Sequence, residues 1–252
     1  EIAAGSSLEG GQLHLLAKNR VLWTRRVGAI NGLAGRDLDG DGRAEIIARA
    51  GSRRGAVLVF DGAGRLQWQR RFAEPVTAIG SSGGPLLVGT ASGRVYRLVA
   101  PGVTVGEYRL GAEVLGFGEG LAVTADGGLY RLDRDPPTLL RHLEIVPGQV
   151  QITADALVVL REGQLSLIEA EAIWPVTVDE RVTSLAIDPQ PRRGQRVIVA
   201  GTDRGRVRLF GLTLDQPPLL AQPDLAETRD GYLYSVAVND PDGNIVNVSL
   251  EV

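Results

Sequence analysis

The sequence contains no cysteine and no methionine, and its 27 basic residues include a single lysine, Lys18. Without cysteine there can be no disulfide, no thiolate metal site and no cysteine nucleophile. No apolar run approaches the ~18 residues of a membrane-spanning helix, and Glu1–Gly5 has no basic leader of a signal peptide. The missing methionine, absent even at position 1, indicates a mature chain or an excised domain. The excess of arginine is typical of a GC-rich bacterial genome.

Charge and aromatic content are also modest. The 27 basic and 30 acidic residues give a net charge of −3, which leaves no large basic field, so nucleic acid is not an expected partner. Aromatic residues make up only 5%, whereas 33 glycines and 13 prolines separate short apolar runs. This composition is typical of an all-β protein with many tight turns, and 252 residues can form one such domain.

One pattern recurs seven times along the chain. A glycine is followed two residues later by Leu, Val or Ile, which opens an alternating apolar run such as Val57–Phe60 or Val95–Leu98. A repeat of roughly 20–50 residues that is built from short strands indicates a propeller or a solenoid. The marker glycines are Gly11, Gly55, Gly93, Gly127, Gly163, Gly205 and Gly243.

The third repeat predicts four strands, over residues 76–79, 86–90, 95–98 and 103–110. Four short antiparallel strands, repeated radially, make a propeller blade. We therefore predict one domain over residues 1–252, a seven-bladed β-propeller of four-stranded antiparallel blades. The first repeat begins at its second strand and the seventh ends after its third, so closing the ring requires shared or additional strands.

Three tryptophans, Trp23, Trp68 and Trp174, fall in the outer strand of their repeats. They are either a ligand-stacking set or wedges that fill the gap between blades, and the second interpretation is favoured because large aromatic side chains bury much area. Arginine pairs at residues 25–26, 53–54, 70–71 and 192–193 mark either a basic contact surface or solvated strand ends.

An acidic loop, Asp37–Glu45, separates the first two strands of the second repeat. Carboxylates occupy its positions 1, 3, 5 and 9, as Asp37, Asp39, Asp41 and Glu45, and Gly42 stands at position 6. Ca²⁺ takes 6–8 oxygen ligands, and alternate acidic residues on a curled loop turn their oxygens to one centre. We predict a Ca²⁺ site formed by Asp37, Asp39, Asp41, the Arg43 carbonyl and Glu45. The other interpretation is a solvated acidic turn.

These residues carry a family resemblance. Asp37–Glu45, followed by Ile46 and Ile47, resembles the calcium loop of FG-GAP (integrin-alpha-like, VCBS-type) propeller repeats, and Gly55–Trp68 resembles a blade of PQQ-like (quinoprotein-type) repeats. The resemblance implies a loop that binds Ca²⁺ and stiffens its blade, in a propeller that binds a ligand or a protein.

Little in the sequence indicates catalysis. The two histidines, His14 and His142, lie in different repeats, and neither a nucleophile elbow nor a phosphate-binding P-loop is present. We expect a non-catalytic scaffold that binds a protein or glycan on the extracytoplasmic side (periplasmic, secreted or at the cell surface) and does not insert into a membrane. The alternatives are a structural subunit of a larger surface assembly and a PQQ-type or channel-site enzyme.

Overall fold

The computed structural model describes residues 2–5, 10–17, 20–81, 84–118, 120–143, 147–152, 157–169, 172–176, 178–187, 196–204, 206–212, 219–220, 233–239 and 245–251. All of its regular elements are β-strands. Two compact units make up the chain, unit 1 over Glu1–Val146 and unit 2 over Pro147–Val252. No helix in the described residues is long and apolar enough to cross a membrane.

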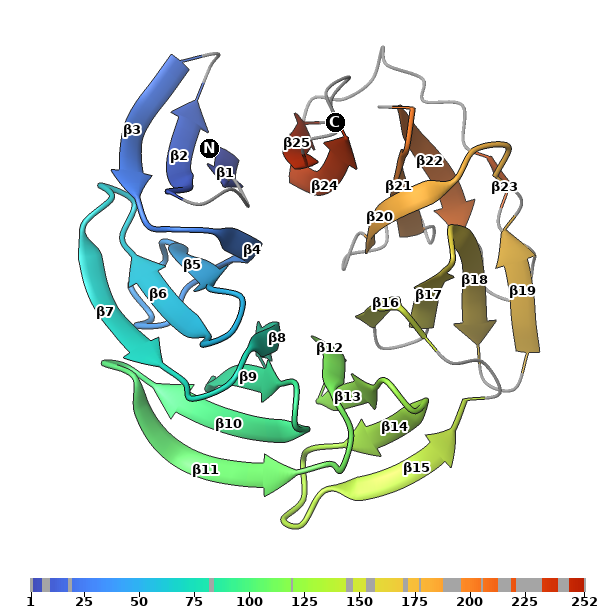
Figure 1. Cartoon of the computed structure of the whole chain (residues 1–252), viewed down its shortest axis with the longest axis horizontal. Helices are drawn as coiled ribbons and strands as arrows, with labels where there is room; N and C mark the ends of the chain where they lie inside the picture. Colours follow the sequence, from blue (N-terminus) through green and yellow to red (C-terminus); the bar gives the residue numbers. More distant parts are fainter. Residues whose placement is uncertain are drawn as a thin grey trace. The chain divides into compact units, whose positions relative to one another are not determined.

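Unit 1 holds four antiparallel sheets, each a propeller blade whose strands are neighbours in sequence order (Figure 1). Blade 1 consists of β1 (Ile2–Gly5), β2 (Gln12–Ala17) and β3 (Arg20–Arg26). Blade 2 consists of β4 (Ile30–Arg36), β5 (Glu45–Ala50), β6 (Ala56–Phe60) and β7 (Leu66–Arg71). Blade 3 consists of β8 (Val76–Ser81), β9 (Leu86–Thr90), β10 (Arg94–Val99) and β11 (Val103–Arg109). Blade 4 consists of β12 (Val114–Gly118), β13 (Leu121–Thr124), β14 (Gly128–Arg131) and β15 (Thr138–His142).

Unit 2 holds two further blades and a two-stranded sheet. Blade 5 consists of β16 (Gln149–Ile152), β17 (Leu157–Arg161), β18 (Gln164–Glu169) and β19 (Ala172–Val176). Blade 6 consists of β20 (Val182–Ile187), β21 (Arg196–Thr202), β22 (Val207–Leu212) and β23 (Leu219–Leu220). The last two strands, β24 (Leu233–Asn239) and β25 (Ile245–Glu251), pair only with each other among the described residues.

The prediction of a β-propeller is confirmed, but the prediction of seven four-stranded blades is wrong. In the part of the chain that the structure describes, there are six blades of three or four strands, and blade 1 has three. The difference lies in the last repeat, which the sequence predicts to end after the third strand of a blade, over residues 245–250. In blades 3 and 4, the first strand of one blade (β12) lies against the first two strands of the blade before it (β8 and β9). In the same way, β24 lies against β20 and β21, the first two strands of blade 6. The strands β24 and β25 therefore correspond to the first and second strands of a blade. The sequence of an apolar hairpin with a glycine in its turn has the same pattern whether the hairpin forms the first and second or the second and third strands of a blade. The marker Gly243 itself lies outside the described residues.

The strand β6 of blade 2 is buried on both faces. Val57 and Val59 belong to an apolar cluster shared with blade 3, whereas Leu58 and Phe60 belong to a cluster shared with blade 1. Successive side chains of a strand point to opposite faces, so a strand that packs on both neighbouring blades is apolar throughout. Burying one such Val or Leu side chain fully contributes about 1.5–3 kcal/mol. This explains the continuous apolar run Val57–Phe60 that follows Gly55.

Two of the marker glycines, Gly55 and Gly93, lie where the linker to the next blade passes. A Cβ on Gly55 would be 2.5 Å from the backbone nitrogen of Val76, and a Cβ on Gly93 would be 2.5 Å from the carbonyl oxygen of Ala112. At these two positions glycine is therefore a steric requirement of the backbone, since no other residue fits without a shift.

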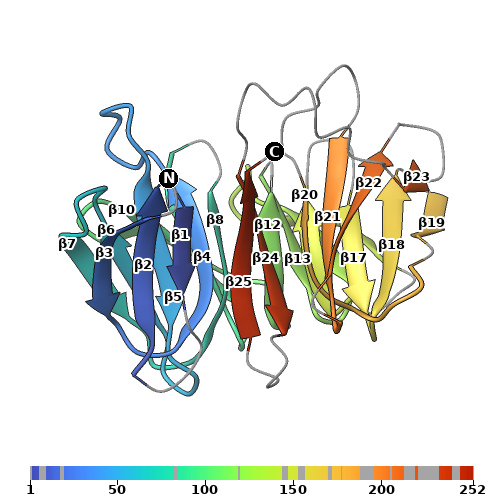
Figure 2. The ribbon, with the colours of Figure 1, turned by 90° about the horizontal axis from the view of Figure 1, so that it is seen from above.

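Each blade of unit 1 has two edges along which its turns lie (Figure 2). The linker edge carries the turns between second and third strands and the linkers from a fourth strand to the next blade. The opposite edge carries the turns between first and second strands and between third and fourth strands. Backbone hydrogen bonds join the parts of the linker edge: Val27 N–H donates to Gly11 O in blade 1, and Phe72 N–H donates to Gly55 O in blade 2, at 3.0 and 2.8 Å.

Candidate metal site

The acidic loop lies at the opposite edge of blade 2, between β4 and β5. Arg36, the last residue of β4, pairs with Glu45, the first residue of β5, so residues 37–44 close a hairpin. Gly40 and Gly42 have φ angles of 81° and 83°. Residues with a side chain rarely adopt this left-handed conformation, which explains why glycine stands at both positions.

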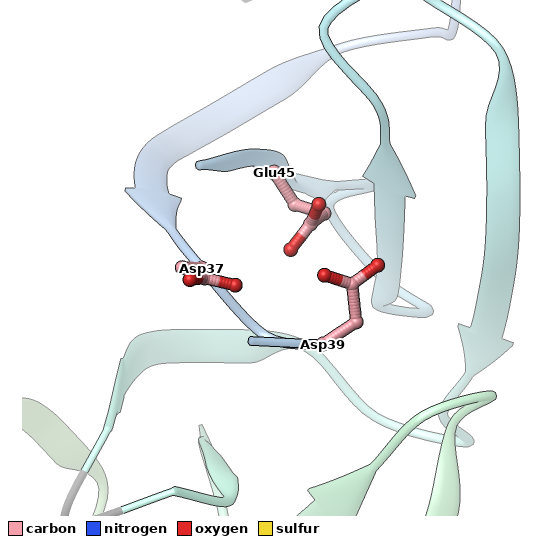
Figure 3. A group of neighbouring side chains, drawn as sticks. All are labelled: Asp37, Asp39 and Glu45. Carbon is pink, nitrogen blue, oxygen red and sulfur yellow. The ribbon is translucent and has the colours of Figure 1, made fainter. Parts of the chain in front are cut away.

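Three of the four predicted acidic ligands come together. Carboxylate oxygens of Asp37, Asp39 and Glu45 all lie within 4.8 Å of one another. Figure 3 shows the three side chains directed toward one centre, Asp37 from the end of β4, Asp39 from the loop and Glu45 from the start of β5. The fourth predicted carboxylate, Asp41, is outside this group.

Backbone N–H groups of the loop hold the carboxylates in place. Asp37 accepts hydrogen bonds from Gly40 N–H at 2.7 Å and from Gly42 N–H at 2.9 Å. Glu45 accepts a hydrogen bond from Leu38 N–H at 2.7 Å. Each carboxylate oxygen has two lone pairs, so these bonds still leave acceptor capacity for an ion.

Leu38 and Glu45 connect the loop to the interior of the unit. The side chain of Leu38 packs against the apolar cluster between blades 2 and 3, whereas its neighbours Asp37 and Asp39 are exposed. Glu45 is only 3% exposed. The loop therefore has one buried carboxylate at its base and two exposed carboxylates above it.

The surroundings of Glu45 disfavour its ionised form. Burial raises the pKa of Glu45, and the negative charges of Asp39, Asp41 and Asp37 raise it further, against the opposing hydrogen bond from Leu38 N–H. In the described part of the chain no arginine, lysine or histidine forms an ion pair with Asp37, Asp39 or Glu45. A buried carboxylate without a cation is costly, and it is stabilised when a cation is bound beside it.

This donor set fits a hard divalent cation. It offers only oxygen atoms, from a curled loop whose backbone N–H groups already orient the carboxylates, and Ca²⁺ is bound by such oxygens at about 2.3–2.6 Å. Asp37, Asp39 and Glu45 would hold the ion, which would supply the positive charge that the loop lacks. Its chemistry there is structural, since it would neutralise the acids and fix the hairpin between β4 and β5.

The remaining predicted ligands lie farther along the loop. Asp41 and Arg43 are exposed, and Asp41 accepts a hydrogen bond from Arg43 N–H at 2.7 Å. Both residues line a hollow of about 710 Å³ beside the loop. The other wall of this hollow is the turn between β6 and β7, where Asp61 accepts hydrogen bonds from the backbone N–H and the Nε of Arg65. This neighbouring turn is not among the predicted site residues, although its Asp61-Gly62 pair is a turn signal.

The wedge interpretation of the tryptophans is confirmed for Trp23 and Trp68. Trp23 of blade 1 lies against Gly64 of blade 2, and Trp68 of blade 2 lies against Gly102 of blade 3. Trp23 also donates its indole N–H to Gly62 O at 3.0 Å. The side chain of Trp174 lies outside the described residues.

The two histidines are far from any catalytic arrangement with each other. His14 lies in β2 and its Nδ1 is 2.8 Å from Thr24 Oγ1, whereas His142 is an exposed residue at the end of β15. Neither belongs to the group of carboxylates in the acidic loop.

Comparison with known proteins identifies the fold but not a family. No protein-family model and no curated protein sequence matches the chain, so its resemblance to FG-GAP and PQQ-like repeats stays a prediction. Among solved structures, the chain is similar to BBS1N in complex with ARL6DN, with a TM-score of 0.63 and 12% identity over 98% of this chain and 91% of that one. It is also similar to Saccharomyces cerevisiae Sqt1, with a TM-score of 0.61 and 12% identity over 83% and 68% of the two chains. A computationally designed protein, Ika8, gives a TM-score of 0.60 and 15% identity over 97% and 79%. At these identities the similarity shows a β-propeller fold alone.

Proposed function

We propose that this chain is a calcium-stabilised, non-catalytic β-propeller that binds a protein partner on the extracytoplasmic side. The observation that carries the calcium part is the meeting of Asp37, Asp39 and the buried Glu45 within 4.8 Å. Asp41 and the Arg43 carbonyl would complete the ligand set after a small movement of the loop. The likeness of Asp37–Glu45 to the calcium loop of FG-GAP repeats supports the choice of ion.

The binding part of the proposal is supported by the fold. BBS1N, a propeller of similar structure, was crystallised in complex with ARL6DN, which is a protein partner of that propeller. Many surface turns on a rigid set of blades form a good contact platform. Because fold alone does not determine function, this step remains a proposal from analogy.

The extracytoplasmic location follows from the proposed ion. A surface loop of this kind, with modest affinity for the ion, would be filled where Ca²⁺ is plentiful. A channel-site enzyme would instead require a carboxylate with a perturbed pKa in a catalytic pocket. Within the described residues, the pKa of Glu45 is raised by burial and by its acidic neighbours, and the pKa values of Asp61, Asp126 and Glu180 are lowered by hydrogen bonds within turns and linkers.

The test is thermal unfolding of the chain with Ca²⁺ and with EGTA. A ligand that binds only the folded state stabilises it by about 2.7 kcal/mol at a hundredfold excess over Kd. We expect a clear rise in Tm with Ca²⁺ that is lost in Asp39→Asn and in Glu45→Gln and reduced less in Asp41→Asn. Asp133→Asn is the matched control, because Asp133 is exposed in a turn of blade 4 away from the loop. If Ca²⁺ did not change the Tm of the wild-type chain, the loop would be a solvated acidic turn and not a Ca²⁺ site.

A light-scattering measurement on the same samples addresses the alternative of a structural subunit. A binding module should be monomeric with and without Ca²⁺. A chain that forms stable higher assemblies under both conditions would favour the structural alternative.

A further inference from the structure

Three arginines occupy the same position in three consecutive blades. Arg26, Arg71 and Arg109 are the last residues of β3, β7 and β11. In each blade the next residue donates its backbone N–H to the carbonyl of the marker glycine, at 2.8 to 3.0 Å. The three guanidinium groups therefore start from equivalent points of the linker edge, one in each of blades 1 to 3.

Two more arginines lie on the same edge. Arg53 and Arg54 stand in the turn between β5 and β6 of blade 2. This turn is joined to the linker from blade 1 by a hydrogen bond from Gly51 N–H to Ala29 O at 3.0 Å. The linker edge is thus continuous from one blade to the next, and we call Arg26, Arg53, Arg54, Arg71 and Arg109 the basic edge.

The basic edge carries charge that is not neutralised within the molecule. All five side chains are exposed. In the part of the chain that the structure describes, none of them forms a hydrogen bond or an ion pair. Of the other predicted arginine pairs, Arg25 and Arg70 are used between blades, and residues 192–193 lie outside the described residues.

Of the described acidic side chains along this edge, Glu74, Glu107 and Asp126 are already engaged, whereas Glu113 stands in the linker before β12 and its charge acts on the partly buried Arg49. Glu74 accepts hydrogen bonds from the N–H and the hydroxyl of Ser92, at 2.9 and 2.8 Å. Glu107 lies 3.3 Å from Arg94. Asp126 accepts a hydrogen bond from Thr124 Oγ1 at 2.6 Å. Glu74, Glu107 and Asp126 are thus used within their own blades, and Glu113 carries one negative charge against the five positive charges of the basic edge. The edge therefore keeps an excess of positive charge for an external anion.

We propose that the basic edge is a docking surface for an extended acidic polypeptide segment, an inference that rests on the protein-binding function proposed above. Guanidinium groups match carboxylates in geometry and form strong paired hydrogen bonds with them. The five arginines are spread over three consecutive blades rather than converging on one point. A partner must therefore present several carboxylates along its length, as a segment rich in Asp and Glu does.

Other anionic macromolecules fit this edge less well. Proteins that bind single-stranded nucleic acid stack bases on exposed aromatic rings, but Trp23 and Trp68 are held against glycines in turns of the opposite edge. The chain also has a net charge of −3, which weakens long-range attraction to a polyanion as large as a nucleic acid. A local contact with a peptide depends on the arginines themselves and is less affected by the rest of the chain.

The experiment measures binding of a fluorescein-labelled oligoglutamate peptide to the full chain by fluorescence anisotropy, at low and at moderate salt. We expect saturable binding that weakens as salt is added, and no binding of a matched oligoglutamine peptide. The triple variant Arg26→Ser, Arg71→Ser and Arg109→Ser should lose about tenfold in affinity, since each exposed charge pair contributes a modest amount.

A second triple variant is the matched control. Arg20→Ser, Arg131→Ser and Arg134→Ser change the net charge equally, but these exposed residues lie toward the opposite edge. Equal losses in the two triple variants would show that only net charge matters and would overturn the proposal. Tighter binding of a single-stranded oligonucleotide, or of vesicles rich in an anionic phospholipid, than of oligoglutamate would overturn the choice of a polypeptide.

Failure of this inference is distinguishable from failure of the proposed function. If oligoglutamate does not bind while Ca²⁺ still raises the Tm of the same sample, the basic edge is not a docking surface for acidic segments and the calcium-stabilised scaffold stands. If Ca²⁺ does not change the Tm while peptide binding depends on Arg26, Arg71 and Arg109, the proposed calcium site is wrong and the proposed docking surface is supported.

Discussion

Trp68 lies across the backbone of Gly102, so closely that a Cβ on Gly102 would be 2.9 Å from Trp68 Cε3. Trp68 belongs to the fourth strand of blade 2 and Gly102 to the turn between β10 and β11 of blade 3. Arg70, two residues after Trp68, donates from Nη1 to Gly102 O at 3.0 Å. One glycine thus receives both an aromatic ring and a guanidinium group from the neighbouring blade.

The same contact recurs one blade earlier. Trp23 packs on Gly64, where a Cβ would be 2.6 Å from Trp23 Cδ2, and Arg25 donates from Nε to Gly64 O at 2.7 Å. A Trp-x-Arg sequence in the last strand of a blade therefore packs and hydrogen-bonds that blade to the next one. The repeat of this contact makes it a structural element of unit 1 rather than a ligand-stacking set.

Gly102→Ala should destabilise the chain. Gly102 has a φ of 89°, which costs an L residue about 1–2 kcal/mol, and the added methyl group would also push Trp68 away, at a further cost of about 1–3 kcal/mol. Gly111→Ala is the control, because Gly111 has the same φ of 89° and open space around its Cβ position. Thermal unfolding of the two variants separates the backbone cost from the contact with Trp68. Equal Tm values for both variants would mean that the tryptophan contact contributes nothing.

Gly55→Ala tests why the marker glycine repeats. Its Cβ would be 2.5 Å from the nitrogen of Val76 and 2.9 Å from the oxygen of Glu74, both backbone atoms that cannot move without shifting the linker. We expect a loss of about 1–3 kcal/mol in the free energy of unfolding. In Gly35→Ala the methyl group meets nothing within 4 Å, and this variant should unfold at the wild-type temperature. Urea unfolding of both variants provides the measurement, and an unchanged midpoint for Gly55→Ala would contradict the steric explanation.

The raised pKa of Glu45 predicts a specific dependence on pH. Because the folded state favours the protonated carboxyl, this group contributes stability below its ordinary pKa of 4.5, and that contribution is lost as the pH rises through the raised value. Without Ca²⁺, the Tm of the wild type should therefore fall relative to the Tm of Glu45→Gln as the pH rises from 4.5 toward neutrality. The increase in wild-type Tm on adding Ca²⁺ should grow over the same interval, because the ion binds the carboxylate. If the two proteins in EGTA had Tm values that changed in parallel with pH, the ionised form of Glu45 would not be destabilised by its surroundings.

Much of the fold could be predicted from the sequence because both of its main signals are local. Alternating apolar residues specify strands, and a glycine before each third strand is required where the linker passes, as at Gly55. The number of blades could not be predicted in the same way. A hairpin such as β24–β25 has the same pattern whichever two strands of a blade it represents, and only its contact with β20 identifies it.

The acidic loop is also a local signal: its spacing predicts an ion site, and the carboxylate oxygens of Asp37, Asp39 and Glu45 lie within 4.8 Å of one another. Spacing alone gave no reason to separate Asp41 from the other three. The burial of Glu45, the anchoring of Leu38 in the cluster between two blades, and the hollow shared with Asp61 all depend on contacts with distant parts of the chain.

Glu180→Gln should destabilise unit 2, because this buried carboxylate joins the turn between β21 and β22 to the start of blade 6. Its Oε2 accepts a hydrogen bond from the fully buried Thr202 hydroxyl at 2.7 Å, and its Oε1 accepts one from Arg206 at 2.8 Å and one from Arg208 at 3.3 Å. An amide has a single acceptor oxygen, so either its NH₂ group faces the guanidinium groups or the Thr202 hydroxyl loses its acceptor. We expect a Tm lower by several degrees at neutral pH.

The difference between this variant and the wild type should itself depend on pH. The hydrogen bond from Thr202, together with the charges of Arg206, Arg208 and Arg204, lowers the pKa of Glu180. A lowered pKa contributes stability above the ordinary value of 4.5 that is lost as the pH falls through the folded-state value, so wild type and Glu180→Gln should converge in strong acid. Glu162→Gln is the control, since Glu162 is exposed and its contact with Arg161 is a surface pair at 3.6 Å that contributes little. A Tm for Glu180→Gln equal to that of Glu162→Gln at neutral pH would show that the buried carboxylate does not hold the turn, and that the apolar cluster shared by blades 5 and 6 is sufficient to fix it.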